Sequence, residues 1–83
     1  MLITYDPGKN AVNEAKHGVS LALARKIDWD SVEAEQDFRL NYGEDRYIAQ
    51  TLIDGRLHVV VFVIRDDALR IISLRKAGTA AGR

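Results

Sequence analysis

The chain has 83 residues, which allow one domain with one modest core, close to the lower limit of what folds without a disulfide, a metal or a partner. It contains no cysteine, so disulfides, thiolate metal sites and cysteine nucleophiles are excluded. Twelve basic and twelve acidic side chains give a formal net charge of zero. This balance argues against nonspecific nucleic-acid binding by a uniformly basic domain.

Metal, cofactor and membrane signals are weak. The two histidines, His17 and His58, are far apart in sequence, so we expect no zinc site and no cofactor. The segment Met1 to Tyr5 lacks the basic region and long apolar run of a secretory signal, and no apolar run is long enough to span a bilayer. We therefore expect a cytoplasmic protein. Charge is uneven along the chain, however, because all the charged residues from Leu69 to the end are basic.

The first elements are a short strand and a helix. The run from Leu2 to Tyr5 is apolar and β-branched and predicts a strand. Pro7 behind Asp6 indicates a capped helix start, and Gly18 indicates its left-handed end. A weakly apolar face of this helix is predicted from Ala11, Val12 and Ala15.

A second short helix is predicted from its Ser20 cap to about Ile27. The residues expected to point inward are Leu21, Leu23, Ala24 and Ile27. The next segment, Val32 to Leu40, fits a weak edge strand as well as an irregular loop, and both alternatives stay open. A turn is predicted at Asn41 to Gly43.

Three strands follow. Arg46 to Ile53 is strand-like, and Asp54-Gly55 is a strong hairpin signal because both turn residues take positive φ. Arg56 to Arg65 is almost continuously apolar, as in a central strand covered on both faces. Asp66-Asp67 turns the chain into a last strand, Leu69 to Lys76. The predicted fold is α+β, with two short helices on one face of an antiparallel sheet that ends in a three-stranded meander.

Four sequence elements occur in an order that resembles the BrnT family, toxins of bacterial type II toxin–antitoxin modules. They are Asp6-Pro7-Gly8-Lys9 to Ser20, Gly43-Glu44-Asp45-Arg46, Asp54-Gly55-Arg56 with Val59-Val60-Val61, and Arg70 to Ala77. The resemblance covers nearly the whole chain and implies a single RelE-like domain over residues 1–83. Family members usually continue into a C-terminal helix, but residues 78–83 are too short and glycine-rich for one, so we expect that helix to be absent or truncated.

Strand alternation assigns side chains to faces. If Asp54-Gly55 is a two-residue loop, Thr51 lies opposite His58 and Glu44 opposite Arg65. A second two-residue loop at Asp66-Asp67 would place Arg75 beside His58, on a face with Tyr47, Thr51 and Ser73. The helices are then expected on the opposite face, formed by Ile48, Leu52, Leu57, Val59, Val61, Val63, Ile72 and Leu74.

RNA cleavage without a metal requires a base for the 2′-hydroxyl proton and positive charge for the pentavalent phosphate. His58 and Arg75 form the first candidate pair, and the plain alternative is a polar pair on a solvated surface. The resemblance supports Arg75 through Ile72-Ser73-Leu74-Arg75, and Arg46 through the Gly-Glu-x-Arg element. Arg65 completes the candidate catalytic residues; its structural alternative is an ion pair with Glu44.

This register places Arg46 and Arg75 on opposite faces. Either a β-bulge intervenes or one of the two arginines is structural.

Six other positions have structural interpretations. His17 precedes the helix-ending glycine and is expected to cap carbonyls rather than to catalyse. A stripe on the first helix, formed by Lys9, Asn13 and Lys16, is expected to be a solvated face. Trp29 and Tyr42 are expected to pack in the core rather than to stack on bases.

The resemblance implies a toxin that cleaves RNA without a metal, inhibits growth, and is neutralised by a cognate DNA-binding, BrnA-like antitoxin. The expected partners are therefore RNA and that antitoxin, in a hetero-oligomeric complex or with a homo-oligomer. One alternative is a catalytically weak module that binds the antitoxin and acts in transcriptional autoregulation. Another is an RNA-binding fold without chemistry.

Overall fold

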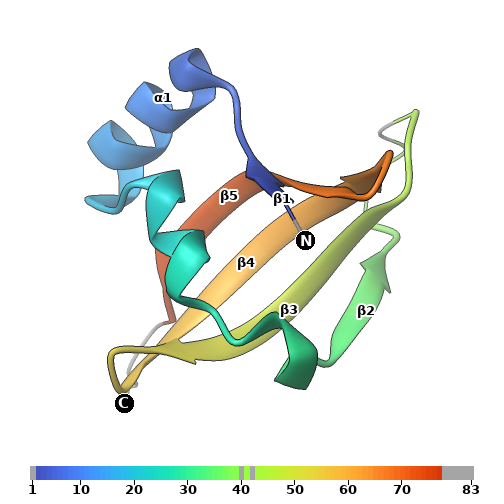
Figure 1. Cartoon of the computed structure of the whole chain (residues 1–83). Helices are drawn as coiled ribbons and strands as arrows, with labels where there is room; N and C mark the ends of the chain where they lie inside the picture. The colour runs from blue at the N-terminus through green and yellow to red at the C-terminus, as the bar shows by residue number, and fades with distance from the viewer. Residues whose placement is uncertain (1, 40, 42, 78–83) are drawn as a thin grey trace.

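The computed structural model describes residues 2–39, 41 and 43–77, arranged around one five-stranded sheet (Figure 1). The strand order is β1-β5-β4-β3-β2, and β1 runs parallel to β5 while the other neighbours are antiparallel. The elements are β1 (Leu2–Thr4), α1 (Pro7–His17), the 3₁₀ helices η1 (Leu21–Lys26) and η2 (Trp29–Ser31), β2 (Ala34–Asp37), β3 (Arg46–Ile53), β4 (Arg56–Arg65) and β5 (Ala68–Lys76).

The predicted α+β class and C-terminal meander are confirmed, but the sheet is mixed rather than antiparallel. Between β1 at one edge of the sheet and β2 at the other, the chain passes through α1, η1 and η2, and the antiparallel strands that follow bring β5 back beside β1. No helix within the described residues is long and apolar enough to cross a membrane. The predictions for Tyr42 and for the tail after Ala77 lie outside the described residues.

The ends of α1 are capped as the sequence predicts. Asp6 accepts a hydrogen bond from the backbone N–H of Lys9 at 2.9 Å, and Pro7 occupies the first turn. Gly18 has φ +71° and donates its N–H to the Glu14 carbonyl oxygen at 2.8 Å. Because an L side chain is strained at this φ, glycine ends the helix here.

The inward face of α1 is polar, contrary to the prediction. Ala11 and Ala15 are exposed and Val12 is 66% exposed, whereas Asn13 is only 5% exposed. The expected solvated stripe of Lys9, Asn13 and Lys16 is therefore wrong for Asn13. The apolar residues of this helix are too small to determine its rotation by burial, so hydrogen bonding determines it instead.

Asn13 connects α1 to the edge of β5. Its Nδ2 donates to the carbonyl oxygens of Val19 and Leu74, both at 2.8 Å, and its Oδ1 accepts from the Leu74 N–H at 3.2 Å. Since β1 pairs with β5 only over Ala68 to Arg70, the backbone of Leu74 lies beyond the last strand partner on that side. The Asn13 amide supplies the donor and acceptor that a further strand would have supplied.

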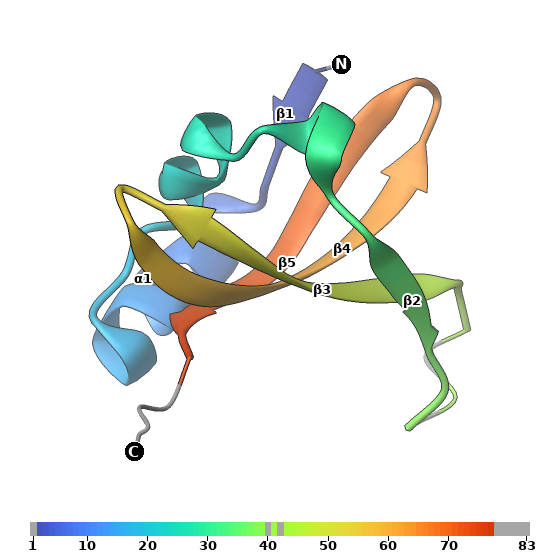
Figure 2. The same cartoon turned by 90° about the horizontal axis from the view of Figure 1, so that it is seen from below.

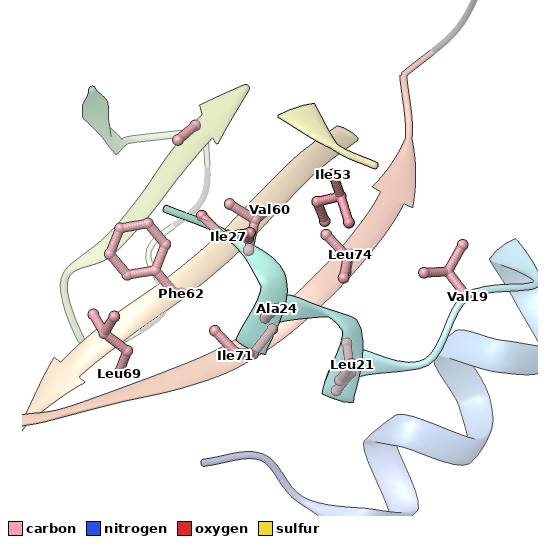
Figure 3. Packing of buried hydrophobic residues seen from close by; sticks show 11 residues of the cluster. Val19, Leu21, Ala24, Ile27, Ile53, Val60, Phe62, Leu69, Ile71 and Leu74 are labelled. Carbon is pink, nitrogen blue, oxygen red and sulfur yellow. The ribbon is translucent and has the colours of Figure 1, made fainter. Parts of the chain in front are cut away.

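The predicted second helix forms as the 3₁₀ helix η1, with Ser20 as its cap accepting from the Ala22 N–H at 3.1 Å. Its apolar residues point at the sheet (Figure 3). The buried core consists of Val19, Leu21, Ala24, Ile27, Ala49, Ile53, Val60, Phe62, Leu69, Ile71 and Leu74. Leu23 is only partly buried against this core.

The core lies on the opposite face of the sheet from the one predicted. The helices cover Ala49 and Ile53 of β3 together with Val60 of β4, rather than the face of Ile48 and Val59. β4 is apolar on both faces, so its own pattern could not decide between them. On β3, Ala49 and Ile53 are buried whereas Gln50 is exposed, and this difference indicates which face of the sheet the helices cover.

Both predicted two-residue loops are confirmed. Asp54 and Gly55 have φ +50° and +77°, and Asp66 and Asp67 have φ +47° and +65°. The β3–β4 register is also the predicted one, with Thr51 opposite His58. The open alternative for residues 32–40 resolves as the edge strand β2, and Trp29 packs edge-on against Phe62 at a ring distance of 5.1 Å, as expected for a core residue.

We predict that Asn13→Ala lowers the free energy of unfolding by about 2–3 kcal/mol, because it leaves the N–H and carbonyl of Leu74 without their partner. Urea unfolding followed by circular dichroism measures this change. Glu14→Ala, on the exposed side of the same helix, is the control and should change stability little. Equal stability of the two variants would contradict the anchoring role of Asn13.

Candidate active site

One face of the sheet lies away from η1 and η2, and we call it the open face (Figure 2). Strand alternation and register assign to it residues from β3, β4 and β5. These residues are Arg46, Ile48, Gln50, Leu52, Leu57, Val59, Val61, Val63, Arg65, Ala68, Arg70, Ser73 and Arg75. The three valines are buried, whereas Arg65 and Arg75 are exposed at opposite ends of the face.

A β-bulge in β5 brings Arg75 to the open face. Phe62 pairs with Ile71 but Val61 pairs with Ser73, so β5 contains one extra residue at this point. Arg75 consequently lies opposite Val59, and Lys76 takes the place opposite His58. The predicted pairing of His58 with Arg75 is therefore wrong. A β-bulge is also the explanation that lets Arg46 and Arg75 share one face.

Glu44 brings Arg46 and Arg65 together. Arg65 donates from Nη2 to Glu44 Oε1, the ion pair that was the structural alternative for this arginine, and Arg46 Nε lies 3.6 Å from Glu44 Oε2. Asp37 lies directly opposite Arg46 on β2 and accepts from Arg39 Nε and Nη2 at 2.8 and 2.7 Å. This end of the open face therefore carries three arginines around two carboxylates.

The pKa of Glu44 is lowered from its ordinary value of 4.5, mainly because the carboxylate accepts the hydrogen bond from Arg65. Partial burial opposes this effect, and the charges of Arg65 and Arg46 add to it. Glu44 is thus a carboxylate at neutral pH that holds two arginines, and its low basicity makes it a weak proton acceptor.

Arg75 occupies a separate part of the open face. It lines a groove of about 550 Å³ together with Gln50, Val59 and two acidic residues, Glu33 and Glu35. Measured along the strands, the positions of Arg75 and Arg46 are separated by four residues of extended chain, or about 13 Å. Among the described residues neither Arg75 nor Arg70 forms a salt bridge.

His58 lies on the opposite face, beneath the helices, and is 3% exposed. Its Nδ1 is 2.7 Å from the carbonyl oxygen of Arg56, and because a carbonyl can only accept, Nδ1 carries the proton. The structure therefore brings together Arg46 and Arg65, places Arg75 on the same face, and does not bring His58 to them.

Sequence reasoning overlooked Arg70 and the carboxylates of β2. Arg70 lies opposite Val63, which places it on the open face as well. Arg70 precedes the bulge, so counting back from the predicted Asp66-Asp67 loop already gives this pairing, and strand alternation could have found it. Within residues 2–39, 41 and 43–77, no three His, Cys, Asp or Glu side chains are grouped so that they could hold a metal ion.

Comparison with known proteins gives the class of protein, a ribonuclease toxin. The family model described as the ribonuclease toxin, BrnT, of type II toxin–antitoxin systems matches residues 5–80, and the chain belongs to this family. Membership in a type II system implies an antitoxin partner.

The fold is similar to that in the crystal structure of the Brucella abortus ribonuclease toxin, BrnT. The two chains are 27% identical with a TM-score of 0.75, and the match covers 95% of this chain and 99% of the Brucella chain. No match was found among curated proteins.

We predict that Glu44→Gln lowers stability at neutral pH and that its difference from the parent disappears in acid. A carboxylate whose folded-state pKa is depressed stabilises the fold above its unfolded pKa, here near 4.5, and this contribution is lost as pH falls through the folded-state value. Urea midpoints at a series of pH values measure the effect. Glu14→Gln is the control, and a Glu44→Gln difference that stayed constant with pH would contradict the ion-pair assignment.

Proposed function

We propose that this chain is an endoribonuclease toxin that cleaves RNA on the open face of its sheet, and that Arg46, Arg65 and Arg75 are its catalytic arginines. The observation that carries the proposal is the β5 bulge, which places Arg75 on the same face as the Glu44-bound pair. Family membership supplies the chemistry, because the family is described as ribonuclease toxins. We further propose that the architecture is RelE-like.

The proposed reaction is attack of a ribose 2′-oxygen on the adjacent phosphorus. The new P–O2′ bond forms as the 2′-hydroxyl proton passes to a base, and the P–O5′ bond breaks as the departing O5′ takes a proton from water. The products are a 2′,3′-cyclic phosphate and a 5′-hydroxyl. Negative charge builds up on the pentavalent phosphorus group, and guanidinium groups stabilise it through paired hydrogen bonds. No step needs a metal ion.

A carboxylate is our candidate for the group that accepts the 2′-hydroxyl proton. Glu35 lies opposite Ile48 on β2, which directs it to the open face, and it lines the same groove as Arg75. Glu44 is less suited because its pKa is lowered by Arg65. His58 is buried on the other face, and we propose that its role is structural.

The partner proposed for this toxin is a cognate, DNA-binding antitoxin of BrnA type, which covers the toxin in a hetero-oligomeric complex and prevents RNA cleavage. A toxin that cleaves cellular RNA acts where that RNA is, so we propose a cytoplasmic location.

We predict that Arg75→Ala loses about 2.7–4 kcal/mol of transition-state stabilisation, a factor of about 10²–10³ in kcat, by analogy with loss of one oxyanion-hole donor. Arg75→Lys recovers part of this, because a point charge does not reproduce the guanidinium fork. Cleavage of a defined RNA by purified variants provides the measurement, with thermal melts to verify folding.

The matched control is Arg56→Ala, which removes an exposed arginine near the β3–β4 loop, outside the open face. Glu35→Gln tests the proton acceptor in the same assay and should lower kcat by about 10²–10⁴. Undiminished cleavage by folded Arg75→Ala would move the site to Arg46 and Arg65.

We also predict that expression of this chain alone arrests growth and degrades RNA, that Arg75→Ala does neither, and that co-expression of the cognate antitoxin restores growth. The measurement is growth and total RNA after induction. Normal growth with intact RNA, in a strain lacking the antitoxin, would contradict the toxin proposal. It would favour a catalytically weak module that binds the antitoxin.

A further inference from the structure

Three basic side chains of α1 take no part in anchoring the helix. Asn10 and Asn13 anchor α1 through hydrogen bonds, with Asn10 Oδ1 accepting from the Leu21 N–H at 2.7 Å. Lys9, Lys16 and His17 instead line a groove of about 390 Å³ between α1 and β5. Anchoring of α1 does not account for these basic residues, and we therefore consider whether the groove binds a ligand.

The two lysines are exposed and available to a ligand. They are seven residues apart, which places them on the same side of the helix about 10 Å apart along its axis. In the described part of the chain neither lysine forms an ion pair, whereas Lys26 pairs with Asp54 at 2.9 Å. Among the described residues that line the groove, Asp6 alone is acidic, and its carboxylate is already engaged with the N–H of Lys9.

The groove is continuous with the open face. Ser73 lines it and also lies opposite Val61 on the open face, two residues from Arg75. Beyond Arg70 the edge of β5 is flanked by α1 and not by a strand, since β1 pairs only as far as Arg70. A chain lying along the open face at Arg75 can therefore pass over Ser73 and reach the lysines of α1.

We propose that the α1–β5 groove binds backbone phosphates of single-stranded RNA, so that the substrate runs from the arginines of the open face across β5 to Lys9 and Lys16. This inference rests on the proposed function. Lysine ammonium groups bind phosphate as point charges, and the apolar side chains of Val12 and Ile72 in the groove offer contact surface for ribose or base. The groove binds RNA and does no chemistry itself.

The test is the salt dependence of RNA binding by the double variant Lys9→Gln/Lys16→Gln. The probe is a fluorescent 2′-O-methyl oligonucleotide, which lacks the attacking hydroxyl and cannot be cleaved. Two lost phosphate contacts should reduce the slope of log K against log salt by about 1.4, at about 0.7 per contact for a single strand. The deficit should appear with an oligonucleotide of about twelve nucleotides and vanish with one of about four, which fills only part of the site.

Lys26→Gln/Lys76→Gln is the matched control, because it removes the same charge near the β3–β4 loop, where Lys76 lines a pocket and Lys26 pairs with Asp54. Its slope should equal that of the parent. In cleavage assays with the long RNA, the Lys9/Lys16 variant should raise KM and leave kcat unchanged.

The outcomes separate the groove from the proposed function. RNA cleavage by the parent with equal slopes in both double variants would overturn the groove and leave the ribonuclease proposal standing. RNA binding without cleavage, with a reduced slope in the Lys9/Lys16 variant, would support the groove and refute the enzyme. Loss of antitoxin binding in that variant, with RNA binding intact, would assign the groove to the protein partner and overturn the inference.

Discussion

The contact between Asn13 and the backbone of Leu74 determines how the rest of this small structure is arranged. It satisfies the β5 edge where β1 ends, and its third hydrogen bond, to the Val19 carbonyl, fixes the turn into η1. Because a buried backbone group without a partner is costly, α1 is held with its polar side inward although its apolar residues then face solvent. The rotation of α1 in turn determines that Lys9 and Lys16 flank β5.

The β-bulge in β5 has the corresponding effect on the sheet. Side chains alternate with a period of two, so one extra residue reverses the faces of everything after it. Leu69 and Ile71 before the bulge and Leu74 after it all reach the core, although an unbroken strand could not bury them together. The same reversal carries Arg75 to the open face. Core packing and the position of the candidate catalytic arginine are therefore consequences of a single irregularity.

Net charge gave little indication of the electrostatics of this face. The carboxylates at one end, Asp37 and Glu44, are engaged with arginines, and Arg65 lowers the pKa of Glu44, which favours its charged form at neutral pH. The Arg65–Glu44 pair orients a guanidinium group more than it stabilises the fold, since solvent screens an ion pair whose arginine is exposed. Arg70 and Arg75 form no salt bridge within the described residues, so positive charge remains available for phosphate.

Local signals in the sequence determined the features that depend on neighbouring residues. The caps of α1, the two hairpin loops, the β3–β4 register and the Glu44–Arg65 pair were all predictable, because turn chemistry and strand alternation act over a few residues. The buried face of the sheet, the inward side of α1 and the partner of Arg75 were not. β4 is apolar on both faces, Asn13 is anchored by a backbone group 61 residues away, and the bulge forms only when both halves of β5 bury their leucines and isoleucine. These three features depend on contacts between distant segments, which is why only the tertiary structure decided them.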